Sequence, residues 1–250
     1  MKTVVVSNRK GGSAKSTTAV NVAAAMAQQG KKVLLLDFDT QGHASIGVGA
    51  RPVREGGFHS IFSGNALSFT FVPTAVKNLT LSPANDLFDP LSEPIGEFVL
   101  RERLTAEGVG EFFDLCIIDT PPTYDALLKN ALAVADAVII PVLPHFLGEV
   151  GVRQMVRALF QTGATLGHSI GLVRVLPVMY NAHLPSHRQS VANLRQLFGE
   201  EKFLPPIRLD IKAAEAFEAR LPLSLYDPKG RAARDYMEVA QMLSKLLYSS

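Results

Sequence analysis

The stretch at residues 8–17, N-R-K-G-G-S-A-K-S-T, constrains this chain more than any other. It lies between an apolar run over residues 3–7 and an alanine-rich run over residues 17–28, so it predicts a strand that turns through glycines into a helix. Such a turn leaves several backbone N–H groups pointing into one concavity at the positive end of the helix. The stretch therefore predicts a phosphate-binding loop.

The end of this loop fits a nucleotide with magnesium. Lys15 can reach the outer phosphates, and the hydroxyl of Ser16 is a suitable ligand for magnesium. Arg9 and Ala14 stand where the generic pattern G-x-x-x-x-G-K-[ST] has glycine. If the turn requires a positive φ at position 14, Ala14 costs about 1 kcal/mol of strain. A glycine turn before an ordinary helix is the plain alternative.

The rest of the chain alternates strands and helices. With 250 residues and 47% hydrophobic content, and with no linker, repeat or charge block, residues 1–250 predict a single domain. Strands are expected over residues 3–7, 32–38, 112–119, 137–142, 170–179 and 203–207. Helices are expected over residues 16–29, 95–104, 124–135, 148–161, 184–198, 212–218 and 231–247, with a short helix and a strand within 56–94. This order predicts an α/β fold with a doubly wound, mostly parallel sheet between two helix layers, as in P-loop NTPases.

Acidic residues follow two of the expected strands. Asp37 and Asp39 end the strand at 32–38, and Asp119 ends the strand at 112–119. Because the carboxyl ends of parallel strands meet at the ligand crevice, these carboxylates should face the phosphates. Phosphate would repel them unless a cation or a water lay between. The pattern therefore predicts a magnesium and water site that includes Asp39 and Asp119.

Composition excludes several classes of protein. The single cysteine, Cys116, rules out an internal disulfide and a multi-cysteine metal site, and its apolar neighbours predict a buried thiol. We expect a cytoplasmic protein with no membrane partner, because no leader precedes the first strand and no apolar run is long enough to span a bilayer. Residues 1–125 carry 11 Lys and Arg against 13 Asp and Glu, and residues 126–250 carry 14 against 10. This basic second half favours a polyanionic partner.

A second lysine, Lys10, lies inside the loop. The sequence K-G-G-x-x-K-[ST] resembles the deviant phosphate loop of the ParA/MinD/Soj family of dimeric ATPases, in which that lysine contacts the nucleotide of the partner subunit. Residues 37–42 are similar to the family's D-x-D-P-Q-G switch, with Thr40 in place of proline. Residues 119–122 look like its Walker B strand end, and residues 214–216 and 226–229 are similar to its L-A-E-A and Y-D-P-x-S segments. The resemblance covers nearly the whole chain and favours the ParA branch.

The resemblance implies slow hydrolysis of ATP to ADP and phosphate, with Mg2+, in an ATP-induced sandwich homodimer. Asp39 would position or deprotonate the attacking water, Lys15 would neutralise charge in its own subunit, and Lys10 would do so across the interface. Ser16 and, through water, Asp119 would hold the magnesium. The implied nucleotide-binding set is Lys10, Gly11, Gly12, Ser13, Ala14, Lys15, Ser16 and Thr17 at the phosphates, and Asn181 with Ile207, Arg208 and Asp210 at adenine. Asn181 could equally be an ordinary loop-capping asparagine.

ParA-type proteins coat nonspecific DNA in the ATP state and are released by a partner that stimulates hydrolysis. The resemblance therefore implies association with the nucleoid and with a ParB-like or cargo-adaptor protein. Nonspecific binding needs only basic side chains that face phosphates. The candidates are Arg188, Arg195, Arg220, Lys229, Arg231 and Arg234. For each of them a solvated basic surface is the alternative.

Several rival functions share the expected fold. The nearest is the same switch positioning a protein cargo, such as carboxysomes or chemotaxis clusters, in place of a plasmid or chromosome. A MinD-like membrane ATPase would need a basic amphipathic tail beyond the last expected helix, and the sequence shows none there. Nitrogenase-like iron proteins need cluster cysteines, and a ligase of the dethiobiotin-synthetase type has no evident use for Lys10.

Overall fold

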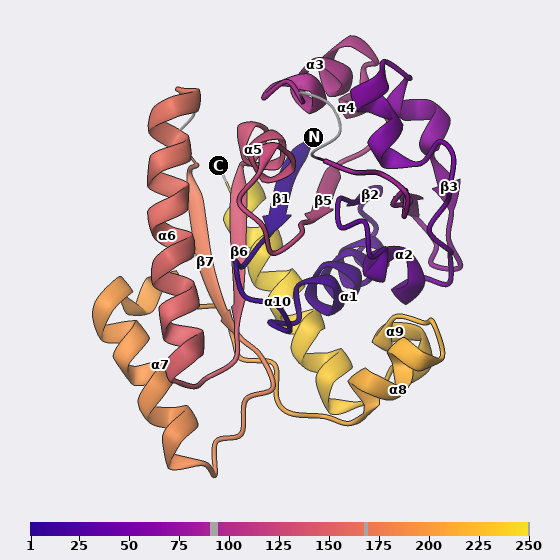
Figure 1. Ribbon diagram of the computed structural model, residues 1–250. Helices are drawn as coiled ribbons and strands as arrows, with labels where there is room; N and C mark the ends of the chain where they lie inside the picture. The colour runs from indigo at the N-terminus through magenta and orange to yellow at the C-terminus, as the bar shows by residue number, and fades with distance from the viewer. Residues whose placement is uncertain (91–94, 168–169, 250) are drawn as a thin grey trace.

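The computed structural model describes residues 1–90, 95–167 and 170–249 of the chain. Within these residues a seven-stranded sheet has the order β3-β4-β2-β5-β1-β6-β7 (Figure 1). Neighbouring strands are parallel except β3 and β4, which are antiparallel. The strands are β1 (Lys2–Val6), β2 (Val33–Asp37), β3 (Val72–Pro73), β4 (Leu79–Ser82), β5 (Leu115–Asp119), β6 (Ala137–Val142) and β7 (Leu172–Pro177). The expected mostly parallel sheet is confirmed.

Helices cover both faces of the sheet, as expected for a doubly wound fold (Figure 1). The α-helices are α1 (Lys15–Gln28), α2 (His43–Gly47), α3 (Val99–Ala106), α4 (Val109–Phe112), α5 (Ala126–Ala133), α6 (Phe146–Leu166), α7 (Pro185–Phe198), α8 (Lys212–Glu218), α9 (Leu223–Tyr226) and α10 (Arg231–Tyr248). Short 3-10 helices are η1 (Phe58–Ser63), η2 (Leu67–Thr70) and η3 (Glu200–Lys202). The helices α1 and α10 pack on one face, and α5 and α6 pack on the other.

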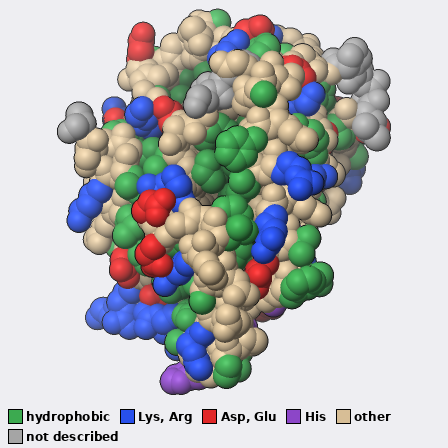
Figure 2. Space-filling model, turned by 90° about the vertical axis from the view of Figure 1, so that its left-hand side faces the viewer, with side chains coloured by type: hydrophobic (Ala, Val, Ile, Leu, Met, Phe, Trp, Pro, Cys, Tyr) green, Lys and Arg blue, Asp and Glu red, His purple; other side chains and the backbone are tan. Residues whose placement is uncertain are grey.

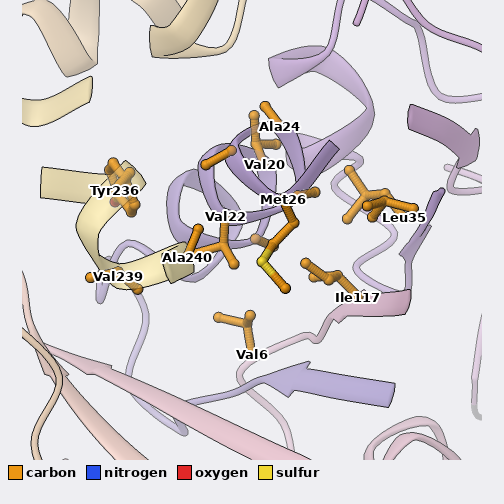
Figure 3. Packing of buried hydrophobic residues seen from close by; sticks show 14 of the residues in the cluster. Val6, Val20, Val22, Ala24, Met26, Leu35, Ile117, Tyr236, Val239 and Ala240 are labelled. Atoms are coloured by element: carbon orange, nitrogen blue, oxygen red, sulfur yellow. The ribbon is translucent and has the colours of Figure 1, made fainter. Parts of the chain in front are cut away.

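Alternate residues of the buried strands pack into different layers. Val6 of β1 joins the core beneath α1 and α10, whereas its neighbour Val5 joins the core beneath α5 and α6. Figure 3 shows the first of these cores, in which Met26 of α1 points toward Val6 and Ile117 of the sheet, and Ala240 of α10 lies beside α1. Because strand side chains alternate between faces, a continuous apolar run supplies both layers.

The expected strand over residues 112–119 is wrong in its first half. Val109–Phe112 forms the short helix α4 after Gly108, whose φ is 59°, and the pairing of β5 with β1 begins only at Leu115. Phe112 is 64% exposed, so its apolar side chain does not belong to the buried strand. An apolar pair that precedes a strand has no periodicity of its own, which is why the pattern overextended the strand.

The expected strand over residues 203–207 is not a regular strand. Among the described residues this segment runs beside β7 with one isolated bridge to it, between Phe203 and Val175. Leu204 and Ile207 donate their backbone N–H groups to carbonyls of β7. Pro205 and Pro206 stand between them and have no N–H to donate, so a continuous ladder cannot form.

The remaining expectations differ mainly at the element ends. The short helix and strand expected within residues 56–94 correspond to η1 and β4, and residues 91–94 lie outside the described residues. The helix α3 begins at Val99 rather than at residue 95, and α6 extends to Leu166. Cys116 is fully buried, and burial raises the pKa of its thiol. In the part of the chain that the structure describes, every helix is too short or too polar to cross a bilayer.

Candidate active site

The predicted phosphate-binding loop is the turn between β1 and α1. Gly12 has a φ of 70° and Ala14, the residue before α1, has a φ of 61°, so both adopt the left-handed conformation. The Ser13 hydroxyl donates to the Lys10 carbonyl at 3.0 Å, and the Asn8 amide donates to a carbonyl of β6 at 2.8 Å. Hydrogen bonds thus fix the loop both internally and against the neighbouring strand. Ala14 has no side-chain group that could cap α1, so the first N–H groups of α1 are left for an anion.

The positive φ of Ala14 leads to a test of strain in the loop. A residue with a Cβ loses about 1 kcal/mol in this conformation relative to glycine. We predict that Ala14→Gly raises the free energy of unfolding by up to about 1 kcal/mol. The greater conformational entropy of glycine in the unfolded chain offsets part of this gain. Chemical denaturation measures this difference. Ala192→Gly, at an exposed position in the middle of α7, is the control and should destabilise by about 1 kcal/mol. A loss of stability in Ala14→Gly would contradict the assignment of strain.

Lys15 lies inside the site. It is only 7% exposed, and burial lowers the pKa of its ammonium, while the charges of Asp119 and Asp39 oppose that fall. Its Nζ is 3.5 Å from the Lys10 carbonyl, which is too long for a strong hydrogen bond. A desolvated ammonium with such weak partners is suited to bind a phosphate oxygen.

Lys10 lies at the edge of the site and is held only loosely. Its Nζ is 3.5 Å from Nε2 of His145. The Nδ1 of His145 accepts the N–H of Gly148 at 3.1 Å and so caps α6, which places the proton of the neutral ring on Nε2. Two donors therefore face each other, and the pKa of His145 is lowered by burial and by the Lys10 charge. Among the described residues the Lys10 ammonium forms no ion pair.

Three carboxylates meet beside the loop. Asp37 and Asp119 are fully buried at the ends of the adjacent strands β2 and β5, and Asp39 is 9% exposed. Burial raises the pKa of Asp37 to about 7, although Ser45 opposes the rise by donating both its N–H (2.7 Å) and its hydroxyl (2.6 Å). Burial and the charge of Asp37 raise the pKa of Asp119 well above its usual value, against smaller opposing effects of Ser16 and Lys15. The site therefore favours an added positive charge.

The raised pKa of Asp37 predicts a pH-dependent stability. A group whose pKa is higher in the folded protein stabilises the fold at low pH, and this contribution is lost as pH rises through its folded value, here about 7. We predict that the ligand-free protein gains roughly 1 kcal/mol of unfolding free energy from Asp37 between pH 8 and pH 6. His59, whose folded pKa is about 4, acts in the opposite direction as pH falls below its unfolded value near 6.5. This contribution cancels when the wild type is compared with an Asp37 variant, because both proteins contain His59.

The measurement is denaturant unfolding of the wild type and Asp37→Asn across this pH range. The amide has no charge to bury, so the variant should be the more stable protein at pH 8 and should show a flatter pH dependence. Asp86→Asn, which changes an exposed carboxylate, is the charge-matched control. Parallel curves for the wild type and Asp37→Asn would contradict the prediction.

The acidic cluster fits a magnesium ion shared with a nucleotide. Both oxygens of Asp119 and Oδ1 of Asp37 are buried with no hydrogen-bond partner among the described residues. These are hard oxygen ligands near the Ser16 hydroxyl. The described residues contain no cluster of three His, Cys, Asp or Glu that could hold a metal by itself. That arrangement suits magnesium, which keeps several waters and is bound with substrate phosphates rather than in an all-protein cage.

Two of the four residues predicted at adenine, Asn181 and Arg208, line a hollow of about 740 Å³. Ile207 is buried, and neither Ile207 nor Asp210 is among the lining residues. Arg208 is held in place by Asp235, whose carboxylate accepts from its Nε and its Nη2 (2.6 Å). The Asn181 side chain accepts the N–H of His183 at 2.9 Å, as a loop-capping asparagine does. The structure thus brings Asn181 and Arg208 together.

Comparison with known proteins assigns the family. A family model described as an AAA domain matches residues 1–170. The chromosome-partitioning ATPase Soj of Thermus thermophilus is 34% identical over 243 residues, which are 96% of this chain and 94% of Soj. The chain belongs to the ParA/Soj family of P-loop ATPases. Membership of this family supports an NTPase activity that uses a bound nucleotide and magnesium.

Solved structures confirm the fold of this ParA/Soj-family chain. The ATP complex of a substituted McdA from Cyanothece has a TM-score of 0.84 and 22% identity, covering 99% of this chain and 96% of McdA. Cobyrinic acid a,c-diamide synthase from Mycobacterium smegmatis, with bound ATP analogue and magnesium, has a TM-score of 0.82 and 27% identity, covering 100% of this chain and 97% of that one. The second structure contains both the nucleotide analogue and the metal ion for which the site described above has ligands.

The two C-terminal segments of the ParA/Soj resemblance contact each other. The Tyr226 hydroxyl donates to Glu215 at 2.9 Å, and Lys212 pairs with the same carboxylate at 2.7 Å. Phe217 of α8 lies edge-on to the ring of His43, the first residue of α2. These contacts connect α8 and α9 to the segment that follows Asp39. The sequence pattern singled out both segments, but it gave no sign that they pair.

Two histidines beside the ParA/Soj site were not candidates in the sequence. His145 lies next to Lys10, and His59 hydrogen-bonds the backbone between Asp37 and Asp39. A lone histidine in an apolar context is usually an ordinary core residue, so neither position had a local signal. Each could be found only from its partners in the fold.

Proposed function

We propose that this protein is a DNA-binding positioning ATPase, which hydrolyses ATP in a sandwich homodimer to partition a plasmid or chromosome. In this proposal the ATP-bound dimer coats nonspecific DNA of the nucleoid in the cytoplasm. A ParB-like or adaptor protein stimulates the slow hydrolysis and so releases the dimer. Membership of the ParA/Soj family supports the proposal, and so does the composition of the site.

The strongest support for the proposal is that the side chains of Lys10 and Lys15 have different surroundings. Lys15 points into its own acidic cluster, whereas Lys10 is half-buried, faces another donor and has no ion pair among the described residues. A lysine that the protomer does not use is available to a second protomer. In the dimer Lys10 would therefore stabilise charge that develops on the partner's triphosphate, as an arginine finger does.

The other residues of the site have complementary roles in the proposal. The Gly11 and Gly12 amides, Thr17 and Lys15 bind phosphate oxygens and orient the γ-phosphate. Asp39 accepts a hydrogen bond from the Gln41 N–H at 3.0 Å, which orients its carboxylate to position the attacking water. Ser16, Asp39 and Asp119 would hold magnesium, which neutralises charge on the phosphates when it is bound.

Mixing two inactive variants tests the exchange of lysines. Lys10→Ala keeps Asp39, and Asp39→Ala keeps Lys10, so a mixed dimer has one complete site if Lys10 acts on the partner's nucleotide. An equal mixture should recover about a quarter of the wild-type rate, because half the dimers are mixed and one of two sites in each is complete. Phosphate release measures it. If Lys10 acted within its own subunit, every site in the mixture would lack one group and no activity would return.

The proposed DNA-binding residues form two groups in the structure. Arg188 and Arg195 lie on α7, and the other four lie around α8, α9 and α10, on the opposite side of the view in Figure 1. Arg195 is half-buried and pairs with Glu200 at 3.2 Å. Arg231 pairs with Asp210 at 3.9 Å and donates to a backbone carbonyl, so these two arginines are weaker candidates. On the face that carries α6 and α7, basic side chains form separate groups around a central hydrophobic patch, with acidic side chains among them (Figure 2). The proposed contacts with DNA are therefore made by single basic groups to backbone phosphates, without base readout.

Gel-shift titration with ATP and magnesium tests this part of the proposal. We predict that the protein binds arbitrary duplex DNA, with an affinity that falls steeply between 50 and 200 mM salt, by about tenfold or more for several phosphate contacts. Arg188→Ala and Arg234→Ala should each weaken binding to all sequences and lower the salt slope by about one. Arg101→Ala, on α3 at the other end of the molecule, is the control. An absence of binding at low salt would contradict a DNA-bound state.

The cargo is the point on which the two leading proposals differ. The same ATPase switch could position a protein assembly, and the residues of the site would be the same. The relative reported above is named for chromosome partitioning, which favours a DNA cargo. The genes beside this one provide the test: a centromere-binding protein gene supports DNA partition, and a microcompartment shell cluster supports a protein cargo.

A further inference from the structure

His59 is a buried histidine that has no role in the reaction proposed above. It is the second residue of η1, and its side chain is 0% exposed. Its ring stacks on Phe88 with centroids 4.6 Å apart, and its neighbour Phe58 stacks on Phe38 at 3.9 Å. The ring therefore has one fixed orientation between the ends of β2 and β4.

Both ring nitrogens of His59 have backbone partners. Nε2 lies 3.1 Å from the Phe38 carbonyl, and Nδ1 accepts the N–H of Asn85 at 3.1 Å. Because the backbone N–H of Asn85 can only donate, Nδ1 has no proton and Nε2 carries it. Nε2 then donates to the Phe38 carbonyl. Burial lowers the pKa of His59 to about 4, so this neutral tautomer is the form present at neutral pH.

The Phe38 residue that His59 holds lies between the two acids of the switch. Its N–H donates to the Asp119 carbonyl at 3.0 Å, so the backbone of Phe38 is fixed from β5 on one side and from His59 on the other. Asp39 comes next in the chain, and its carboxylate and carbonyl accept from Gln41 (3.0 Å) and Gly42 (2.7 Å). The position of the Asp39 carboxylate therefore depends on the carbonyl that precedes it.

We propose that His59 is a positioning residue for Asp39, because its Nε2–H fixes the Phe38 carbonyl and thereby sets the backbone from which the Asp39 carboxylate reaches the attacking water. This inference rests on the proposed ATP hydrolysis. A displacement of about 1 Å at a catalytic group can reduce a rate by up to about 100-fold, so a single backbone hydrogen bond at this point matters to the reaction.

The structure distinguishes this role from simple packing. A packing residue would need only the ring that stacks on Phe88, and a phenylalanine would supply it. His59 instead satisfies one donor from the end of β4 and one acceptor from the end of β2. His59 therefore connects the two strand ends by hydrogen bonds. Ser45 makes a second connection of the same kind, because its hydroxyl donates to Asp37 and accepts from the Ala84 N–H at 3.2 Å.

Two amide substitutions separate the two hydrogen bonds of His59. The amide nitrogen of glutamine reaches the place of Nε2, so His59→Gln keeps the donor to Phe38. The amide of asparagine reaches only the place of Nδ1, so His59→Asn keeps the acceptor for Asn85 and loses that donor. We expect His59→Asn to lower kcat at least about tenfold with the KM for ATP changed less than about twofold. We expect His59→Gln to stay within about threefold of the wild-type kcat.

A second measurement reports the position of the switch without catalysis. Hydrogen exchange at the Gln41 and Gly42 amides, in the protein without nucleotide, should accelerate in His59→Asn and stay near wild type in His59→Gln. Phe62→Leu is the control, because Phe62 packs on Phe58 and Phe88 without a hydrogen bond to the switch. It should lower thermal stability and leave kcat and this exchange unchanged.

The experiment distinguishes a failure of the His59 inference from a failure of the proposed function. Equal kcat and equal exchange in both His59 variants would overturn the positioning role, and so would an equal loss in both with a raised KM, which indicates lost packing alone. If the wild type failed to hydrolyse ATP, the proposed function would fail. The exchange measurement would still decide whether His59 holds the segment that carries Asp39.

Discussion

Asp39→Ala is expected to reduce the rate of ATP hydrolysis at least about 100-fold and to leave ATP bound. The physical reason is the position of the carboxylate. Asp39 is 9% exposed beside the loop, its orientation is set by the Gln41 N–H, and its charge acts on Lys15. Removing it takes away the group that orients the water but leaves the phosphate-binding amides intact. Removing one negative charge also lessens repulsion of the triphosphate, so the ATP-bound dimer should accumulate.

Single-turnover hydrolysis and retention of labelled ATP measure the two parts of this prediction. Asp86→Ala, at an exposed carboxylate outside the site, is the matched control and should hydrolyse ATP at the wild-type rate. Hydrolysis by Asp39→Ala at the parental rate would show that another group positions the water. Loss of ATP binding in the same variant would show instead that Asp39 is needed to hold the nucleotide and its metal.

Lys15→Gln is expected to weaken ATP binding by at least about 100-fold and so to prevent dimer formation. Lys15 is the buried cation of a site that holds three carboxylates, and charged hydrogen bonds of this kind contribute roughly 1.5–3 kcal/mol each. Glutamine keeps similar length and polarity but has no charge to oppose the carboxylates or to attract phosphate. Binding should therefore fail before any catalytic step.

Lys10→Gln is the matched comparison for Lys15→Gln, since both change one lysine of the same loop. Because the Lys10 ammonium lies at the edge of its own site, that variant should bind ATP close to normally and lose hydrolysis only in the assembled dimer. Isothermal titration with a non-hydrolysable ATP analogue measures the binding. Equal losses of affinity in the two variants would show that both lysines serve the nucleotide of their own subunit.

Much of the site was predictable because its residues stand at strand ends. The glycine turn after residues 3–7 and the acids after β2 and β5 follow from local apolar runs that stop at polar residues, and parallel pairing then brings these ends together. The strain at position 14 was also accessible, because the chain has alanine at a turn position that favours glycine. The left-handed φ of Ala14 confirms the conformation on which that expectation depended.

Other features were wrong or absent in the sequence interpretation for identifiable reasons. The apolar Phe112 and Phe113 extended the expected β5 strand into what is the helix α4. The segment beside β7 had the composition of a strand, but two prolines remove the donors that a ladder needs. The sequence interpretation gave six basic candidates without predicting how they are arranged, and the fold separates those on α7 from those around α8, α9 and α10.

The amino-acid sequence was enough to predict the layered α/β fold, the phosphate loop with its two lysines and the acids that face it, because each of these depends on residues close together in the chain. Which side chains meet could be seen only in the folded protein. His59 reaches the Phe38 carbonyl across 21 positions, and Lys10 reaches His145 across 135. Hydrogen-bond partners and burial depend on strand order and packing, which join distant segments. Such contacts cannot be predicted from local periodicity. The proposed positioning of Asp39 by His59 could therefore be inferred only from the folded structure.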